Sequence, residues 1–176
     1  MEIESIRKRS SSNSQVQSKQ KNPFRVLIID DDKALLNLLS EFYTEKSFQT
    51  ETCESAESAL NLILDQEEIF DLIICDLNLP EKNGIDFIHE LQAVKIGTPV
   101  ILITAHGTID DAAMALKQGA YDYITKPLNF TELEVLSQRA IKIQNLEKNY
   151  EKLKEKLDGT NSPKELIGTG PKMREL

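Results

Sequence analysis

Short, uninterrupted apolar runs alternate along the chain with segments whose apolar residues recur every three or four positions. Uninterrupted runs are typical of strands covered on both faces, as in parallel sheets, whereas the recurring spacing indicates amphipathic helices. The runs lie at residues 24–29, 70–75 and 99–104, and weaker strands are expected at 50–53 and 121–125. Five strand-then-helix units predict an α/β fold. Right-handed crossovers and size favour a flavodoxin-like, doubly wound (βα)5 parallel sheet with strand order 2-1-3-4-5.

Apolar stripes predict which face of each helix is buried. The first three stripes are Leu35, Leu38, Leu39 and Phe42; Ala56, Ala59, Leu60 and Ile63; and Ile85, Ile88 and Leu91. A capping box of Thr108 and Asp111 is expected to open the fourth helix, which Gly119 ends. Either Asn129 or Thr131 opens the fifth.

The fifth helix is expected to continue beyond the folded domain. Its apolar residues there follow alternating spacings of three and four: Ile143, Leu146, Tyr150, Leu153 and Leu157. This two-heptad pattern is typical of a coiled-coil dimer seam. The alternative is a solvated single helix stabilised by Glu–Lys pairs four residues apart. We favour the dimer seam because its register is unbroken.

Composition divides the chain into four segments. Residues 1–23 are rich in Ser, Gln, Asn, Lys and Arg, so we expect a disordered polar tail, whose basic cluster (residues 7–9) could contact an acidic partner. Residues 24–136 form the folded domain and 137–158 the helical linker, which Asp158-Gly159 is expected to end. Residues 159–176 start a further segment.

Charge and cysteine usage narrow the function classes. Lys and Arg total 21 and Asp and Glu total 29, a net charge of −8, which disfavours general binding to nucleic acid or anionic membranes. No apolar run is long enough to span a membrane, and the first 23 residues lack the apolar stretch of a secretory signal. Cys53 and Cys75 lie outside any metal-binding spacing, so reduced thiols and a cytoplasmic location are expected.

Four carboxylates lie at the ends of two predicted strands. Asp30, Asp31 and Asp32 follow the first strand, and Asp76 ends the third. These strands are neighbours at the point where the strand order reverses, and open α/β sheets bind ligands there. We therefore expect Asp30, Asp31 and Asp76 to converge. Clustered carboxylates repel unless a cation neutralises them, and an all-oxygen site with open positions suits Mg²⁺.

Two further side chains complete a predicted phosphoryl site. The fourth strand ends in Thr104 and the fifth is followed by Lys126, so both border the same crevice. A hydroxyl and an ammonium beside a metal-bound carboxylate can stabilise a phosphoryl group that the carboxylate accepts. Pro127 restricts Lys126, and a cis Lys126–Pro127 bond would aim that side chain inward.

Five sequence motifs together carry a family resemblance. They are IIDDD (28–32), CDLNLPEKNG (75–84), ITAHG (103–107), GAYDY (119–123) and KP (126–127). From about Phe24 to Leu136 the chain resembles the receiver domain of bacterial two-component response regulators. Five motifs in this order at the right strand ends are highly specific.

The resemblance implies a role for each site residue. It implies a Mg²⁺ site formed by Asp76, Asp31, Asp30 (assisting, through water) and the backbone carbonyl of Asn78. It implies Asp76 as the phosphoacceptor, with Thr104 as the switch hydroxyl, Lys126 as the phosphoryl contact and Tyr123 as the switch aromatic. Four other residues near the site are expected to have structural roles. Asp32 is an acid at a helix N-terminus, favoured by the helix dipole, and not a ligand; Cys75 is a core residue and not a redox sensor. His106 is an exposed loop residue, and Gly84 begins a helix without a chemical role.

A subfamily is also indicated. Residues 103–127 resemble the NtrC-like, sigma-54-dependent activators, and residues 165–176 resemble the opening of their AAA+ ATPase domain, although no G-x-x-x-x-G-K-[ST] loop is present. The resemblance implies a cognate sensor histidine kinase as partner. It also implies a homodimer through the linker coiled coil and the face formed by the fourth helix, fifth strand and fifth helix. Direct nucleic-acid or membrane binding by this chain is not expected.

Three other functions remain as alternatives to a phosphorylation-controlled switch. A Mg²⁺-dependent phosphatase of the haloacid-dehalogenase type would need D-x-D-x-[TV] after the first strand, but residues 30–34 read DDDKA. A flavodoxin would need a phosphate loop where the acids lie. A phosphorylation-independent dimerisation scaffold would not need Thr104 and Lys126 facing three acids. We therefore expect a regulatory phosphoacceptor, not an enzyme.

Overall fold

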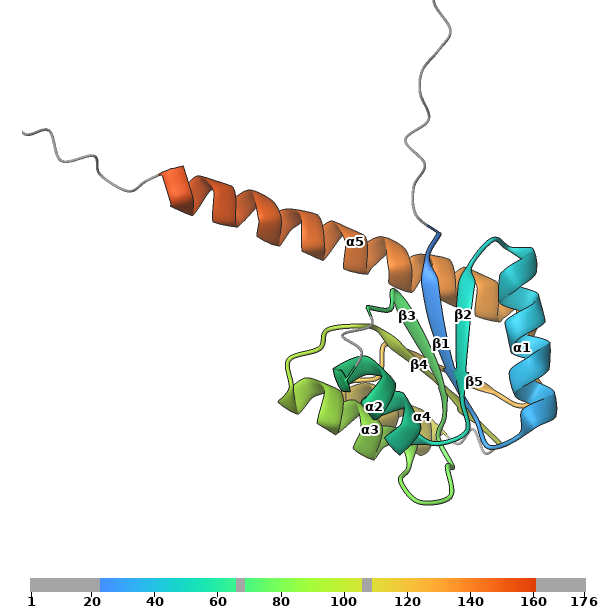
Figure 1. The fold of residues 1–176 in the computed structure, drawn as a ribbon. Helices are drawn as coiled ribbons and strands as arrows, with labels where there is room; N and C mark the ends of the chain where they lie inside the picture. Colours follow the sequence, from blue (N-terminus) through green and yellow to red (C-terminus); the bar gives the residue numbers. More distant parts are fainter. Residues whose placement is uncertain (1–22, 66–68, 106–108, 161–176) are drawn as a thin grey trace, which may run out of the picture.

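The structure is a computed structural model that describes residues 23–65, 69–105 and 109–160. A five-stranded, all-parallel sheet has the order β2-β1-β3-β4-β5, which confirms the predicted fold (Figure 1). The elements are β1 (Arg25–Ile29), α1 (Lys33–Glu45), β2 (Gln49–Cys53), α2 (Ala56–Asp65), β3 (Leu72–Asp76), α3 (Gly84–Ala93), β4 (Val100–Thr104), α4 (Ile109–Lys117), β5 (Asp122–Thr125) and α5 (Phe130–Thr160).

Two apolar cores lie on opposite faces of the sheet. One packs α2, α3 and Ala115 of α4 against one face, and the other packs α1 and α5 against the opposite face. Strands β3 and β4 are buried at every position, because both of their faces are covered. This explains why they appear in the sequence as continuous apolar runs.

The apolar stripe predicted for α1 is correct except at Leu38: Leu39 is buried, and Leu35 and Phe42 are partly buried against the core. Leu36, Leu39 and Tyr43 are buried, whereas Leu38 is 48% exposed. Leucines at consecutive positions offer two overlapping stripes, and the contact with α5 selects between them. The Tyr43 hydroxyl lies 2.7 Å from Ser137 Oγ, so burial of this phenol leaves no unsatisfied polar group. The stripe predicted for α2 is buried in full.

The helix boundaries follow from capping side chains. Asn129 Oδ1 accepts hydrogen bonds from the backbone N–H groups of Thr131 and Glu132, so Asn129 is the residue that opens α5. Gly119 has φ of +102° just after α4, which is the left-handed conformation of a helix end. The predicted capping box at Thr108 and Asp111 and the loop residue His106 lie outside the residues or side chains described.

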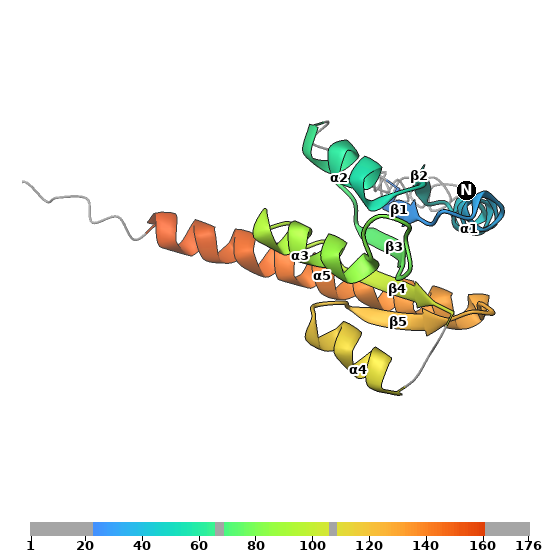
Figure 2. The same cartoon turned by 90° about the horizontal axis from the view of Figure 1, so that it is seen from below.

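Helix α5 projects past the end of the sheet in both views (Figures 1 and 2). It reaches Thr160, slightly beyond the predicted end at Asp158-Gly159. The five predicted seam residues are 40–70% exposed in the single chain: Ile143, Leu146, Tyr150, Leu153 and Leu157. Within the described ranges, no helix is both long and apolar enough to cross a membrane.

Candidate functional site

The candidate site lies where β1, β3, β4 and β5 end. The strands are parallel, so their carboxyl ends meet at one edge of the sheet, and β1 and β3 are neighbours. The strand order reverses between them, because β1 leads to the outer strand β2 and β3 leads to β4. The fold therefore brings residues about 50 and about 100 positions apart in sequence to one point.

Three carboxylates gather at this edge. Asp30 is fully buried, Asp76 is 5% exposed and Asp31 is exposed. One oxygen from each lies within 4.8 Å of the others. The Asp32 backbone N–H donates to Asp30 Oδ1 at 2.8 Å, while the Asp32 side chain caps α1 by accepting from Ala34 and Leu35. Asp32 thus lies at the N-terminus of a helix, as predicted, where it acts as the N-cap, and the other three carboxylates remain for the site.

The Lys126 ammonium bridges the two buried carboxylates. Its Nζ lies 3.1 Å from Asp30 Oδ2 and 3.3 Å from Asp76 Oδ2. The Lys126 backbone N–H donates to the Thr104 carbonyl at 2.8 Å, which fixes the start of the side chain beside β4. Thr104 is 4% exposed at the end of that strand. The Lys126–Pro127 peptide bond is cis.

Burial and the contacts between Lys126 and the carboxylates shift the pKa values at this site in opposite directions. Burial raises the pKa of Asp30 above its ordinary value and the Asp76 charge adds to this, although hydrogen bonds from the Asp32 N–H and Lys126 pull the pKa down. Burial alone would lower the pKa of Lys126, but its hydrogen bonds and charge interactions with Asp30 and Asp76 outweigh burial and raise it. Three carboxylates around one ammonium leave an excess of negative charge that favours a further cation.

The donor set fits a magnesium ion. The cluster offers one carboxylate oxygen from each of three aspartates, and hard divalent cations prefer oxygen ligands. Asp31 is exposed, so an ion held here could keep water and accept a phosphate oxygen. Asn78 follows Asp76 by two residues, and its N–H lies 3.4 Å from Asp76 Oδ1; the structure places its backbone at the cluster.

Gly84 contributes to the site in a way that the sequence reading missed. A Cβ added at Gly84 would lie 2.8 Å from the carbonyl oxygen of Asp76 and 2.8 Å from Leu102 Cδ2. The Gly84 N–H also donates to the Leu77 carbonyl at 2.9 Å. Gly84 therefore begins α3, as predicted, but it also lets the helix pack directly against the backbone of Asp76. The D-x-x-x-P-x-x-x-G spacing was the signal available in the sequence.

The remaining predicted residues lie around this centre. Tyr123 is half-buried on β5 and packs against the core formed with α2 and α3. Cys75 is fully buried, and its thiol donates to the Asp76 carbonyl at 3.2 Å. Burial, together with the charges of Asp76 and Asp30, raises the pKa of this thiol, so it remains a neutral core residue.

Comparison with known proteins agrees with this geometry. Residues 26–138 match the family described as response regulator receiver domain. The chain is 31% identical over 152 residues to the regulatory protein AtoC of Escherichia coli K12, which covers 86% of this chain and 32% of AtoC. It is 40% identical over 107 residues to the transcriptional regulatory protein GlrR of the same organism, covering 61% of this chain and 24% of GlrR.

A solved structure shows the same likeness. The beryllofluoride-activated NtrC4 receiver domain dimer has a TM-score of 0.62 and 30% identity, covering 67% of this chain and 96% of that one. The chain spans about a third or less of the length of the curated relatives AtoC and GlrR.

Proposed function

The chain belongs to the response regulator receiver domain family and resembles NtrC-family regulators, and from this we propose that Asp76 accepts a phosphoryl group from a cognate sensor histidine kinase. The observation that supports this most strongly is the position of Asp76. Its carboxylate is almost fully buried, lies 3.3 Å from the Lys126 ammonium and shares a cluster with two further carboxylates. A nucleophile, a counter-charge and a candidate metal site are therefore assembled at one point.

The proposed transfer is a displacement at phosphorus. An oxygen of Asp76 forms a bond to the phosphorus of a phosphohistidine, the P–N bond breaks, and its electron pair returns to the imidazole of the kinase. Bound Mg²⁺ would supply positive charge to the phosphoryl oxygens. Lys126 neutralises a further part of that charge and Thr104 donates a hydrogen bond to the new acyl phosphate. In this proposal the chain is the phosphoacceptor and no separate substrate pocket is required.

The proposed output is a change in the α4–β5–α5 face. Movement of Thr104 toward the phosphoryl group would open space for Tyr123 of β5. Helix α4 has a small apolar anchor among its described side chains: Ala115 is buried, whereas Met114 and Leu116 are 55% and 45% exposed. A weakly anchored helix can change position at low cost. Because α5 continues into the linker, such a change would alter the dimer arrangement and thereby a sigma-54-type transcriptional output.

The proposal is tested by intact mass spectrometry after incubation with acetyl phosphate, with and without Mg²⁺. The wild type should gain one phosphoryl adduct that requires Mg²⁺, and Asp76→Asn should gain none. Asp86→Asn is the matched control, because Asp86 is an exposed aspartate in the first turn of α3 and should leave the adduct unchanged. An adduct that persists in Asp76→Asn would exclude Asp76 as the acceptor.

A further inference from the structure

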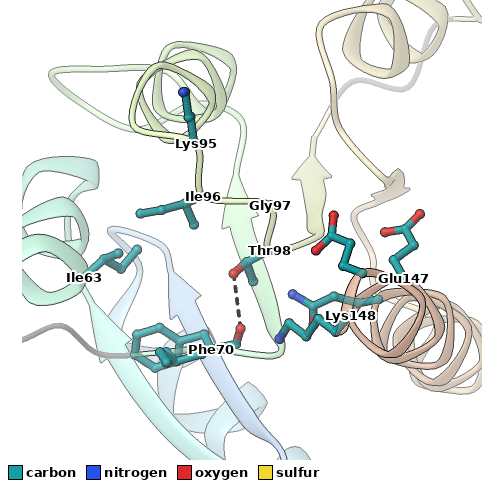
Figure 3. A pocket seen from close by; sticks show the side chains of 11 residues that line it. Ile63, Phe70, Lys95, Ile96, Gly97, Thr98, Glu147 and Lys148 are labelled. Carbon is teal, nitrogen blue, oxygen red and sulfur yellow. Dashed lines mark hydrogen bonds between the residues drawn. The ribbon is translucent and has the colours of Figure 1, made fainter. Parts of the chain in front are cut away.

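A groove lies at the edge of the sheet opposite the carboxylate cluster. It has a volume of about 580 Å³ and runs between α5 and the loops that precede β3 and β4 (Figure 3). Its floor is apolar and includes Ile63, Phe70 and Ile96. Its other wall is the polar inner side of α5, at the point where this helix leaves the domain. The groove is therefore separate from the proposed phosphoryl site.

The α5 wall carries three hydrogen-bond acceptors, one of which is buried without a donor among the described residues. Gln144 is 6% exposed, and its Oε1 is the buried side-chain atom without a partner among the described residues. Glu147 and Glu151 are exposed, and neither forms an ion pair or hydrogen bond with the described residues. The adjacent cation Lys148 is directed to Asp71, at 3.8 Å. The ammonium of Lys95, on the opposite wall, points away from α5 in Figure 3.

This combination of groups specifies the chemistry of a ligand. The buried Gln144 oxygen calls for an N–H donor, and the two exposed carboxylates beside it attract positive charge. The apolar floor requires a ligand with aliphatic surface. An arginine- and lysine-bearing peptide meets both requirements, because these side chains bury their methylene stems on apolar surface while their charged ends bind acceptors.

The chain's own N-terminal segment enters beside this groove. Arg25 donates its backbone N–H to Asp71 Oδ2 at 3.0 Å, and its guanidinium lies 4.9 Å from the centre of the Phe70 ring. The chain preceding Pro23 therefore starts at the rim. From Pro23 back to Arg9 there are 14 residues, or about 45 Å of extended chain. A tethered segment of this length meets the groove at high effective concentration.

Charge also favours this occupant. Residues 1–22 contain five Lys or Arg and two Glu, a charge of +3, so the rest of the chain carries −8 − 3 = −11. Three of the five cations are consecutive: Arg7, Lys8 and Arg9. We propose that the Arg7–Arg9 segment docks in the groove beneath α5, with its cations bound by Gln144, Glu147 and Glu151.

Docking at this position would use a different set of α5 residues from the predicted dimer seam. The acceptors lie at positions 144, 147 and 151, whereas the predicted seam residues lie at 143, 146, 150, 153 and 157. At 100° per residue the two sets are centred about 110° apart on adjacent sides of the helix, and Glu147 flanks the seam beside Ile143. The inference therefore does not depend on phosphorylation of Asp76 or on dimerisation.

Paramagnetic relaxation enhancement in the full chain tests the proposal. A nitroxide is attached at Ser10→Cys, next to the basic cluster; the native Cys53 and Cys75 are buried and should not react. The amide signals of Gly97, Glu147 and Glu151 should lose most of their intensity, and those of α1 should keep theirs. Equal intensities at all of these positions, or broadening centred on Asp31 instead, would overturn the proposal.

A charge exchange identifies the contacts. Glu147→Lys with Glu151→Lys should abolish the broadening, and adding Arg7→Glu, Lys8→Glu and Arg9→Glu should restore it. Glu41→Lys with Glu45→Lys makes the same charge change on exposed positions of α1 and should leave the broadening intact. A mixture of ¹⁵N-labelled chain without nitroxide and spin-labelled chain without ¹⁵N should show no broadening. Broadening in that mixture would assign the groove to the segment of a second copy and contradict docking within one chain.

Discussion

At the scale of single residues, two positions at the site lower the stability of the fold and serve the proposed chemistry. Asp30 is fully buried and is partnered by one backbone N–H and one lysine. Buried carboxylates cost free energy when ionised unless cations compensate them. Gly84 gives up a side chain so that α3 can approach the backbone of Asp76. The site, and not packing of the core, accounts for the residue type at both positions. A prediction follows for each.

Asp30→Asn should stabilise the metal-free protein at neutral pH. The pKa of Asp30 is raised in the folded state above its ordinary value of 3.8, chiefly by burial. A carboxyl group of this kind stabilises the folded protein in its neutral form. This contribution to the unfolding free energy is complete below the pKa of the group in the unfolded chain, and it is lost as the pH rises through the pKa of the group in the folded protein. The asparagine does not ionise, yet its oxygen can still accept from the Asp32 N–H. We expect a gain on the order of 1 kcal/mol in unfolding free energy at pH 7 in chelator.

Urea unfolding at pH 4 and pH 7, with and without Mg²⁺, measures this effect. The gain should shrink toward pH 4, and Mg²⁺ should stabilise the wild type but not the variant. Asp86→Asn serves as the exposed control at both pH values. A variant less stable than wild type at pH 7 in chelator would contradict the prediction.

Gly84→Ala should destabilise the domain and impair the site. The added methyl would meet a backbone carbonyl and Leu102 at 2.8 Å, and overpacking of this kind typically costs about 1–3 kcal/mol. Gly97→Ala is the matched control, because nothing lies within 4 Å of its added Cβ. Chemical unfolding should show a lower unfolding free energy for Gly84→Ala, and mass spectrometry should show less of the acetyl phosphate adduct. Gly97→Ala should match the wild type in both measurements. Equal stability of the two variants would show that α3 can move away from Asp76.

At the scale of elements, the packing of α1 against α5 depends on a buried polar pair. Ser137 Oγ donates to the Leu133 carbonyl at 2.6 Å, which leaves the Tyr43 hydroxyl to donate to Ser137. Around this pair Phe42 contacts Phe130, with ring centres 4.9 Å apart, and Lys46 forms an ion pair with Glu134. The beginning of α5 is therefore held firmly at one end, while its second half projects from the domain.

Tyr43→Phe should cost about 1 kcal/mol of unfolding free energy at pH 7, since one buried hydrogen bond is lost. Burial raises the pKa of Tyr43 above its ordinary value of 10.0. The stabilisation from its neutral phenol is therefore complete below pH 10 and is lost above it. Unfolding measured from pH 7 to pH 11 should show the difference in unfolding free energy between wild type and variant decreasing. Tyr150→Phe, at a position 70% exposed, should match the wild type throughout, and a constant gap would contradict the expected titration.

At the scale of the whole molecule, one side of α5 presents apolar surface that the single chain does not cover. The five seam residues are 40–70% exposed and recur at heptad spacing, which is the pattern of a two-stranded coiled coil. A smaller groove of about 280 Å³, lined by Phe24, Phe48 and Ile141, adjoins Leu146 of the seam. These surfaces support the proposal that a second copy of the chain packs along the linker.

Leu153→Lys should weaken that dimer. A charge at a core position of a coiled coil is desolvated without a partner, and sedimentation should show the variant shifted to monomer at concentrations where the wild type is a dimer. Leu38→Lys, at a 48% exposed leucine of α1, is the control and should sediment as the wild type does. If wild type and Leu153→Lys are both monomeric, α5 is instead a solvated single helix in this chain.

Much of the fold and of the candidate site could be predicted from the sequence. Continuous apolar runs such as residues 72–75 arise because a central parallel strand is covered on both faces. The position of a residue at the end of such a strand then determines that Asp30, Asp76, Thr104 and Lys126 share one edge of the sheet. This inference needs only strand order, because all carboxyl ends of a parallel sheet point the same way.

Other features were decided by packing. Leu35, Leu36, Leu38 and Leu39 offer α1 two equally apolar faces, and the contact between Tyr43 and Ser137, 94 residues apart, selects one of them. The close approach of Gly84 to Asp76 and the unpartnered oxygen of Gln144 likewise depend on distances between separate elements. Periodicity and strand order are properties of the chain and can be read along it. The side of a helix that is buried and the groups that remain without partners are settled when distant segments meet, so only the tertiary structure determines them.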